Sequence, residues 1–347
     1  MKQAPQNCVS GEASAEVFPP VSVILCARNE RDNLSQYLIS LLTQDYPVYE
    51  VIVVNDCSED DTEELLSVWK QKYPHLRSTI IKRDASFLNS RKFAATIGIK
   101  AASYEWLLFT EPGYYPASNQ WIKSMSRHFG EGTDIVLGYS GYTDQKGFPA
   151  NWIKYDACFN AMRYFGFAMA GIPYTGTTGN LAYRKSLFYA HNGFALHAHI
   201  LSGDDLLVNQ AANGRNTAVN FSSEAHTCSV SENSLRGWIR KKCEYFNART
   251  HYKSFHSFLL FLEPFSRTLF LCTFVLLLLR MPDFRQYFLG LFLLRTFIFF
   301  IVTALSAKKF NIRGILSCSV LFDLVMPFVY AYAFFLNKFL SNRNKWK

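Results

Sequence analysis

Two adjacent carboxylates, Asp204 and Asp205, precede an apolar segment in the sequence SGDDLLVNQAA. The spacing of the apolar residues that follow predicts an amphipathic helix that begins at the pair. A carboxylate at a helix start caps backbone N–H groups, and the helix dipole keeps it ionised, which suits a general base. Both uses can hold at once, with Asp204 as the expected cap and Asp205 as the expected base.

Polar side chains also stand at the ends of four short apolar runs that predict strands. The first two runs, VSVILCARN and EVIVVND, are rich in β-branched residues, as buried parallel strands are. Because ligands of open parallel sheets bind at the carboxyl ends of the strands, these polar ends predict a binding site there. The four ends are Arg28-Asn29-Glu30, Asn55-Asp56, Lys82-Arg83-Asp84 and Thr110-Glu111.

The elements that must position these residues alternate between strand and helix. The first turn of the second expected helix is acidic, with Ser58 or Asp60 as its cap. The alternation predicts an α/β fold with a mostly parallel, doubly wound sheet flanked by helices. Strands are expected at 21–29, 50–56, 78–84, 105–111 and 134–142, and helices at 31–44, 58–73 and 89–102.

Composition divides the chain of 347 residues into a globular part and an apolar C-terminal part. Hydrophobic residues make up 49% of the chain, Phe alone numbers 31, and the apolar excess begins at about Phe258. The net charge is +9, and its densest basic stretch runs from Arg236 to Lys253, directly before the apolar part. Since no nucleic-acid-binding motif accompanies this charge, we expect contact with anionic membrane headgroups and not with nucleic acid.

Three apolar stretches, 258–279, 286–306 and 315–336, each approach the roughly 20 residues that cross a bilayer as a helix. Ionisable residues inside such stretches mark function or mutual pairing, and we expect Arg295 to contact Asp323. Three crossings are one possible topology. The alternative places the first stretch in the interface and makes a hairpin of the other two. Neither arrangement agrees fully with the preference of basic residues for the cytoplasmic side.

The eight cysteines are scattered without a CxxC pair or a metal-ligand spacing, which is typical of reduced thiols in a cytosolic compartment. Residues 1–20 are polar, have the composition of a disordered segment and carry no apolar core of a signal peptide. We therefore expect a cytoplasmic catalytic domain that reaches the membrane through its C-terminal part.

The stretch VSVILCARNERDNLSQYLISLLTQDYPVYEVIVVNDCSEDDT resembles the family 2 glycosyltransferases, whose GT-A fold begins with this strand, helix and strand. The resemblance continues through RKFAATIGIKAA, GTTGNLAYRKSLF, SGDDLLVNQ and RGWIRKK, and so covers roughly residues 20 to 255. It implies an inverting transfer of a sugar from a nucleotide-sugar donor. In the family, the acidic pair that matches Asp204 and Asp205 opens a helix, and one carboxylate deprotonates the acceptor hydroxyl.

The same resemblance implies a nucleotide site at the first two strand ends. Asp56 would accept a hydrogen bond from a uracil ring, which favours a UDP-sugar, and Cys26, Arg28 and Glu30 would line the base and ribose pocket. In the alternative interpretation, Asp56 only ends its strand and caps a turn. Lys92 would contact the nucleotide or its diphosphate, or else form a solvated pair with the adjacent arginine.

At the metal site of the family, an Asp-x-Asp motif holds a divalent cation against the diphosphate. Here the stretch is FTEPGYYP, in which Glu111 replaces the first Asp and Gly113 stands in place of the second. One carboxylate, with water and phosphate oxygens, would hold Mg²⁺ or Mn²⁺ more weakly than two. Thr178 stands where relatives often carry Arg.

A basic motif on an interfacial helix closes over the diphosphate in many membrane-attached members of the family. In RGWIRKKCEY, Trp238 fits this motif, while Arg240 and Lys241 occupy its next positions. The cations Arg240, Lys241 and Lys242 would neutralise a leaving diphosphate, or else form a basic stripe that faces the membrane.

These patterns predict four regions: residues 1–20, a glycosyltransferase domain over 21–233, a basic interfacial helix over 234–257 and a membrane domain over 258–340. The leading hypothesis is an inverting glycosyltransferase whose acceptor is a membrane lipid, a lipid-linked sugar or a growing polysaccharide. The alternative is a catalytically degenerate member that serves as a nucleotide-binding or scaffold subunit. A transport component is a weaker third possibility, because three membrane segments make too small a bundle.

Overall fold

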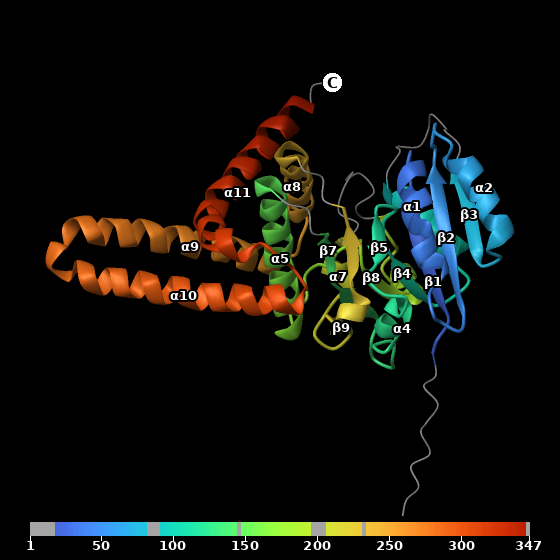
Figure 1. Cartoon of the computed structure of the whole chain (residues 1–347), viewed down its shortest axis with the longest axis horizontal. Coiled ribbons are helices and arrows are strands. Elements are labelled where there is room, and N and C mark those ends of the chain that lie inside the picture. Colours follow the sequence, from blue (N-terminus) through green and yellow to red (C-terminus); the bar gives the residue numbers. More distant parts are fainter. Residues whose placement is uncertain (1–17, 82–90, 144–146, 196–205, 231–233, 345–347) are drawn as a thin grey trace, which may run out of the picture.

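The computed structural model describes residues 18–81, 91–143, 147–195, 206–230 and 234–344 (Figure 1). Asp204, Asp205 and the predicted strand end Lys82-Arg83-Asp84 lie outside these residues, as do the first seventeen of the N-terminal segment. At the start of the described chain, the Phe18 ring packs edge-to-face on Tyr46, with 5.7 Å between their centroids. The folded part therefore begins before the first strand.

The central sheet has seven strands, in the order β3-β2-β1-β4-β8-β6-β9. Only β8 runs antiparallel to its neighbours β4 and β6, so the expected mostly parallel sheet is confirmed. The strands are β1 (Val21–Ala27), β2 (Tyr49–Asp56), β3 (Leu76–Ile81), β4 (Trp106–Phe109), β6 (Ile135–Gly138), β8 (Leu181–Arg184) and β9 (Thr217–Asn220).

Helices cover both faces of this sheet. Successive side chains of each strand point to opposite faces, so each strand contributes to a core on either side. Val23 and Leu25 of β1 pack in a core with α1 (Arg31–Leu42) and α2 (Thr62–Lys72), whereas Ile24 belongs to a second core with α3 (Arg91–Ala101). A Cβ at Gly98 of α3 would lie 2.7 Å from Ile24 Cγ2, so the glycine allows α3 to approach the sheet closely. The doubly wound arrangement is confirmed.

The prediction of a single strand over 134–142 is wrong, because the chain passes from one sheet to another at Tyr139. Asn180 is fully buried, and its Nδ2 donates to the carbonyl oxygens of Tyr139 (2.7 Å) and Ala225 (2.6 Å). These bonds draw the backbone after β6 towards a second, three-stranded sheet in the order β5-β10-β7. Its strands are β5 (Tyr114–Pro116), β10 (Thr227–Ser229) and β7 (Ser140–Tyr142).

The cap expected for α2 is also corrected. The residue before the helix is Asp61, whose side chain makes no capping bond. Asp60 Oδ1 instead accepts from the backbone N–H of Thr62 (3.2 Å) and from its hydroxyl (2.5 Å). Ser58 plays no part in the helix start, because its hydroxyl accepts from the backbone N–H of Asn29 at 3.0 Å.

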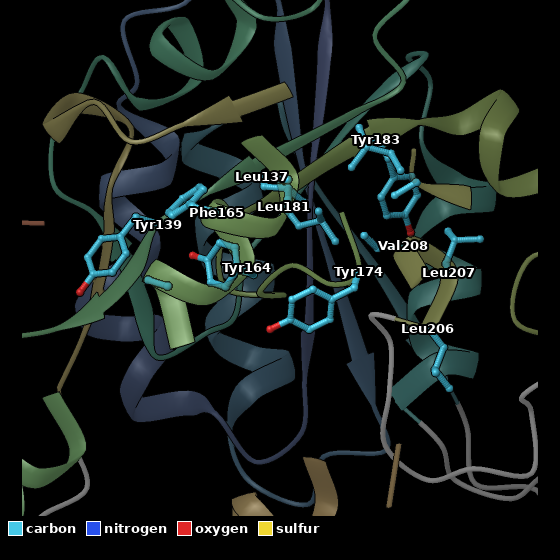
Figure 2. Close-up of a cluster of buried hydrophobic side chains, with 14 of the residues drawn as sticks. Leu137, Tyr139, Tyr164, Phe165, Tyr174, Leu181, Tyr183, Leu206, Leu207 and Val208 are labelled. Carbon is cyan, nitrogen blue, oxygen red and sulfur yellow. The ribbon is translucent and has the colours of Figure 1, made fainter. Parts of the chain in front are cut away.

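The second core is rich in aromatic residues, several of them from α5 (Phe148–Met169), which contacts β7 and β9 (Figure 2). Tyr164 and Phe165 of α5 lie in this core beside Tyr174. The helix α7 (Leu206–Ala211) contributes Leu206, Leu207 and Val208 to the same cluster. The helix expected after the acidic pair is therefore present, although only six residues long.

Three helices in the C-terminal part are long and apolar enough to cross a membrane, as the sequence predicts. The helices α9 (Ser254–Arg280) and α10 (Arg285–Lys309) form an antiparallel pair that extends away from the sheets (Figure 1). The third, α11 (Leu316–Asn344), runs across the base of this pair and packs against α5 and α8 (Leu235–Arg249). The hairpin is thus made by the first two apolar stretches, not by the last two.

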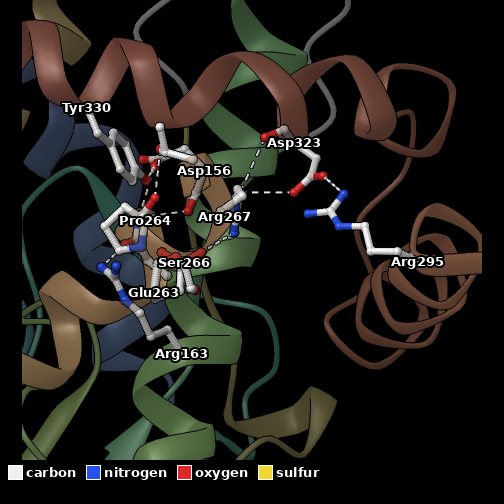
Figure 3. A network of polar contacts seen from close by, with 11 residues as sticks. Asp156, Arg163, Glu263, Pro264, Ser266, Arg267, Arg295, Asp323 and Tyr330 are labelled. Carbon is white, nitrogen blue, oxygen red and sulfur yellow. Dashed lines mark hydrogen bonds and ion pairs between the residues drawn. The ribbon is translucent and has the colours of Figure 1, made fainter. Parts of the chain in front are cut away.

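The expected contact between Arg295 and Asp323 is confirmed (Figure 3). Asp323 also forms an ion pair with Arg267, with 2.9 Å between Oδ1 and Nη1, and Arg267 pairs with Glu263 one turn earlier in α9. These contacts join α9, α10 and α11. Ionisable side chains that would be costly in hydrocarbon are therefore paired with one another.

Candidate active site

The loops that follow β1 and β2 are tied together at the carboxyl edge of the sheet. The backbone N–H of Glu59 donates to Asn29 Oδ1 (2.8 Å), and that of Arg31 donates to Asp60 Oδ2 (3.1 Å). Asn29 and Cys57 both adopt positive φ angles, 55° and 54°, which turn the chain sharply as each strand ends. The polar residues at these two strand ends are therefore held side by side.

The four residues expected to line the base and ribose pocket lie at these two adjacent strand ends. Asp56 is the last residue of β2 and is 9% exposed. Cys26 lies in β1 opposite Val54, and Arg28 is exposed just after the strand. Glu30 is half-buried and accepts from Asn33 Nδ2 at 2.6 Å. The fold brings these four residues to one edge, and their binding of a nucleotide stays a prediction.

Lys92, at the first turn of α3, is only 2% exposed and so is not part of a solvated pair. Its neighbour Arg91 instead reaches across the edge of the sheet to Glu111, with a distance of 2.7 Å between Nη2 and Oε1. Arg91 also donates to the Thr178 hydroxyl at 3.2 Å. No local pattern singles out Arg91 in the sequence, because its partners lie 20 and 87 residues further along the chain.

Glu111 is the centre of this polar cluster. Its Oε1 accepts from Arg91 and from the Thr178 hydroxyl, the latter at 2.5 Å. Burial opposes its ionisation, but the charge of Arg91, both hydrogen bonds and the field of Lys241 outweigh burial and lower the pKa of Glu111. Thr178 therefore supports the carboxylate through a hydrogen bond.

The residues around Glu111 fit a divalent cation poorly. Across the described parts of the chain, no three His, Cys, Asp or Glu side chains come together in a group that could hold a metal ion. The Oε1 of Glu111 is already held by a cation and a hydroxyl. A hard cation such as Mg²⁺ takes about six oxygen ligands, of which this set supplies one carboxylate. No step of a reaction is therefore assigned to a metal.

A cavity of about 420 Å³ lies between this cluster and the helices α5 and α8. Arg91 and Thr178 stand on one wall, and Trp238 and Lys241 of α8 on another. Its size, and its combination of aromatic walls with charged and hydroxyl groups, are typical of a pocket for a small ligand. The remaining lining residues are Tyr114, Ser140, Tyr142, Ile153, Asp156, Ala157, Asn160, Tyr164, Tyr174, Thr175, Gly176, Thr177, Lys242, Glu244 and Tyr245.

Asp156 of α5 holds α8 in place against this cavity. It is 5% exposed, and its Oδ2 accepts from Trp238 Nε1 (2.9 Å) and pairs with Lys242 Nζ (2.6 Å). Its Oδ1 accepts from the Tyr330 hydroxyl of α11 (Figure 3). Burial lowers the pKa of Lys242 despite this carboxylate, so the pair is desolvated. The sequence analysis did not predict a role for Asp156, because no local motif distinguishes it from its neighbours in α5.

The cations Arg240, Lys241 and Lys242 of α8 have different environments, so they do not form a single basic stripe that faces the membrane. Arg240 is exposed and does not line the cavity. Lys241 is exposed at the cavity, close enough to Glu111 for its charge to lower the pKa of that carboxyl. The Lys242 side chain is 12% exposed and paired with Asp156. Lys241 is therefore the member of this trio that the structure places at the polar cluster.

The expected base and cap, Asp205 and Asp204, lie outside the described residues, but the helix that follows them is fixed. Leu206, directly after the pair, is 1% exposed. Asn209 Nδ2 donates to the carbonyl oxygen of Tyr174 at 2.8 Å, and Tyr174 lines the cavity. The helix α7 is thus anchored to a wall of the candidate site through Asn209.

Residues 22–194 match the family model described as Glycosyl transferase family 2. The chain is 27% identical over 214 residues to Glycosyltransferase AglE of Haloferax volcanii, an alignment that covers 61% of this chain and 67% of that protein. It is 28% identical over 131 residues to the UDP-Glc:alpha-D-GlcNAc-diphosphoundecaprenol beta-1,3-glucosyltransferase WfaP of Escherichia coli, which covers 37% of this chain and 48% of the relative.

Among solved structures, the mannosyltransferase PcManGT from Pyrobaculum calidifontis, in complex with GDP-Man and Mn²⁺, is similar with a TM-score of 0.54 and 18% identity. The match covers 68% of this chain and 64% of that one, and at this identity it shows a shared fold. The chain spans about half to two thirds of the length of these three proteins.

Proposed function

Since the chain belongs to the family 2 glycosyltransferases, we propose that it moves a sugar, with inversion, from a nucleotide-sugar to a membrane-associated acceptor. The acceptor would be a lipid-linked sugar or a growing polysaccharide. The observation that carries the proposal is the polar cavity of about 420 Å³ between the sheet edge and the helices that lead to the apolar part. Residues 21–233 would form the transferase domain, 234–257 the interfacial helix and 258–340 the membrane domain.

In this proposal the donor lies along the carboxyl edge of the sheet. Asp56 would bind the base, with a UDP-sugar favoured, and Cys26, Arg28 and Glu30 would surround the base and ribose. Lys92 would add positive charge at the start of α3. This assignment is supported by the tied loops that hold the ends of β1 and β2 together.

Arg91 and Lys241 would neutralise the diphosphate as it leaves, because both line the cavity and both act on Glu111. Trp238 would fix the position of α8 through Asp156, and Arg240 would attract the anionic donor from solvent. Glu111 would in turn hold Arg91 in the orientation that the diphosphate requires.

Asp205 would act as the base, with Asp204 as the helix cap. The acceptor hydroxyl oxygen would form a bond to the anomeric carbon while Asp205 takes its proton. The bond from that carbon to the diphosphate oxygen would break in the same step, and the nucleoside diphosphate would leave with the electron pair. A single displacement of this kind inverts the anomeric configuration.

The proposal is tested with purified full-length protein, a panel of UDP- and GDP-sugars and membranes as the source of acceptor. We expect nucleotide release from at least one UDP-sugar, and a Glu111→Gln variant should slow it, because Arg91 loses its charged partner. Parallel assays in EDTA and in Mn²⁺ measure whether a divalent cation contributes. Nucleotide binding without release from any donor would instead support the degenerate, scaffolding member of the family.

A proposal for the membrane topology is supported by the places where the apolar helices leave and rejoin the sheets. Tyr252, just before α9, donates to the Thr175 hydroxyl at 3.4 Å, and Phe310, just after α10, stacks on Tyr139 with 4.4 Å between centroids. The most hydrophobic window of α11 is 33% buried within the protein, against 0% for α9. We therefore propose that α9 and α10 cross the bilayer as a hairpin while α11 lies in the interface.

In this proposed arrangement the catalytic part would lie in the cytoplasm, with the basic residues gathered on its side of the membrane. Lys308, Lys309 and Arg313 then join the basic stretch before α9 on the cytoplasmic face, which agrees with the distribution of charge in membrane proteins. A reporter inserted in the turn at 281–284 is expected outside, and one fused after Lys347 inside. A C-terminal reporter found outside would show that α11 crosses.

A further inference from the structure

A second cavity, of about 560 Å³, lies on the membrane side of the candidate active site. Its walls come from α5, α8, α9 and α11, and we call it the lateral groove. Its apolar residues include Phe261 and Phe335, which are 56% and 58% exposed. The lining residues are Asn160, Arg163, Lys242, Tyr245, Phe246, Arg249, Thr250, Ser257, Phe261, Pro264, Phe265, Thr268, Pro327, Tyr330, Ala331, Phe334 and Phe335.

The lateral groove adjoins the catalytic cavity. Asn160, Lys242 and Tyr245 line both, so the two share one wall. The far walls of the groove belong to α9 and α11, two of the three helices that are apolar enough for a membrane. A molecule that lies in the groove therefore has one end beside the polar cavity and the other among side chains that face lipid.

Two cations at the inner end of the groove have no carboxylate partner among the described residues. The Arg163 guanidinium donates to the hydroxyls of Tyr174 (3.1 Å) and Tyr245 (3.3 Å) and to Asn160 Oδ1 (2.8 Å). These oxygens are all neutral. Arg249 donates to the carbonyl oxygen of Ser257 at 3.4 Å. The hydrogen-bond partners of both cations are neutral, and Glu263, whose charge reaches Arg163, is itself paired with Arg267, so this end of the groove favours an anion.

Three acids near the groove are already paired with cations. Asp156 pairs with Lys242, and Glu263 pairs with Arg267. Asp323 pairs with both Arg267 and Arg295. Arg163 extends from α5 towards the segment of α9 that carries Glu263, whose charge is shared with Arg267 (Figure 3). The described part of the groove lining has three cations and no carboxylate, which leaves positive charge for a ligand.

We propose that the lateral groove binds a phosphate-bearing lipid, with its hydrocarbon chain along α9 and α11 and its phosphate at Arg163 and Arg249. The inference rests on the proposed function and names its acceptor class: a lipid phosphate whose head, or a sugar linked to it, reaches the catalytic cavity. An arginine fork suits a phosphate, because it donates two parallel hydrogen bonds. A polysaccharide would leave the apolar walls of the groove unfilled.

Native mass spectrometry of the full chain tests the inference with three probes: farnesyl phosphate, farnesol and inorganic phosphate. We expect farnesyl phosphate to bind about tenfold or more tightly than farnesol, and inorganic phosphate not to be retained. Arg163→Gln should weaken farnesyl phosphate by about tenfold and leave farnesol unchanged, while Arg163→Lys should weaken it less. Ala331→Trp should weaken both lipids, because it fills the groove.

Arg280→Gln is the matched control, since it removes the same charge from the exposed far end of α9. UDP binding by every variant checks that the protein is folded. Equal affinity for farnesyl phosphate and farnesol, or an Arg163→Gln variant that matches Arg280→Gln, would overturn the inference. A changed oligomeric mass of Ala331→Trp with unaltered lipid binding would also overturn it, in favour of a protein contact.

The outcomes separate this inference from the proposed function. Nucleotide release from a UDP-sugar without any binding of farnesyl phosphate would support the proposed transferase activity and exclude the lipid site. Binding of farnesyl phosphate that depends on Arg163, without turnover of any donor, would support the groove and count against the transferase.

Discussion

Asp205→Asn is expected to reduce nucleotide release by about 10²- to 10⁴-fold while leaving donor affinity nearly unchanged. Asparagine has almost the shape of aspartate, but it cannot take the proton of the acceptor hydroxyl. The helix that follows is anchored to the cavity wall through Asn209 and Tyr174, so the substitution should not displace the backbone there. The measurement compares turnover with the affinity for the UDP-sugar that is active in the panel.

Asp204→Asn is the matched control for this prediction. Asparagine caps a helix about as well as aspartate does, so a residue that serves only as a cap should tolerate the change. We expect Asp204→Asn to retain most of the turnover. A larger loss in Asp204→Asn than in Asp205→Asn would exchange the two roles, and full activity in Asp205→Asn would exclude it as the base.

Asp156→Ala is expected to lower the free energy of unfolding by about 3–5 kcal/mol. The substitution leaves Lys242 as a buried cation without its carboxylate, and it removes the acceptor for Trp238 and Tyr330. The contacts of Asp156 join α5 to both α8 and α11, so their loss should loosen the wall that the two cavities share. Unfolding by guanidinium chloride in detergent micelles measures the change.

Two variants sharpen this prediction. Asp32→Ala removes an exposed aspartate, whose side chain is 92% accessible, and should change stability by less than about 0.5 kcal/mol. A Lys242→Met change made in the Asp156→Ala background should restore part of the loss, because it removes the unpaired charge. If Asp156→Ala were as stable as Asp32→Ala, Asp156 would not be what holds α8.

The sequence predicts those features that depend on local pattern. Runs of β-branched residues that end in polar residues predict β1 and β2, because a strand buried on both faces must be apolar throughout. Long apolar stretches predict the three C-terminal helices for the same kind of reason. Even the contact of Arg295 with Asp323 could be expected, because each is the one charged residue within its apolar stretch, 286–306 and 315–336.

Local pattern failed where a distant side chain decides the path of the backbone. The residues 134–142 have the composition of one strand, yet the chain leaves the central sheet at Tyr139 because Asn180 binds its carbonyl oxygen. The second helix likewise begins later than expected, since Ser58 is engaged by Asn29 of another loop. Neither partner is close in sequence, so no window of residues contains the information.

By itself, the sequence determined the layers of the transferase domain, the identity of its polar strand ends and the apolar C-terminal helices. Only the tertiary structure brought Arg91 and Lys241 to Glu111, buried Lys242 against Asp156 and placed two unpaired arginines at the inner end of an apolar groove. The physical reason is that periodicity and composition record which face of an element is buried. The charge that a side chain meets there depends on residues brought together from far along the chain, 86 positions away in the case of Asp156 and Lys242.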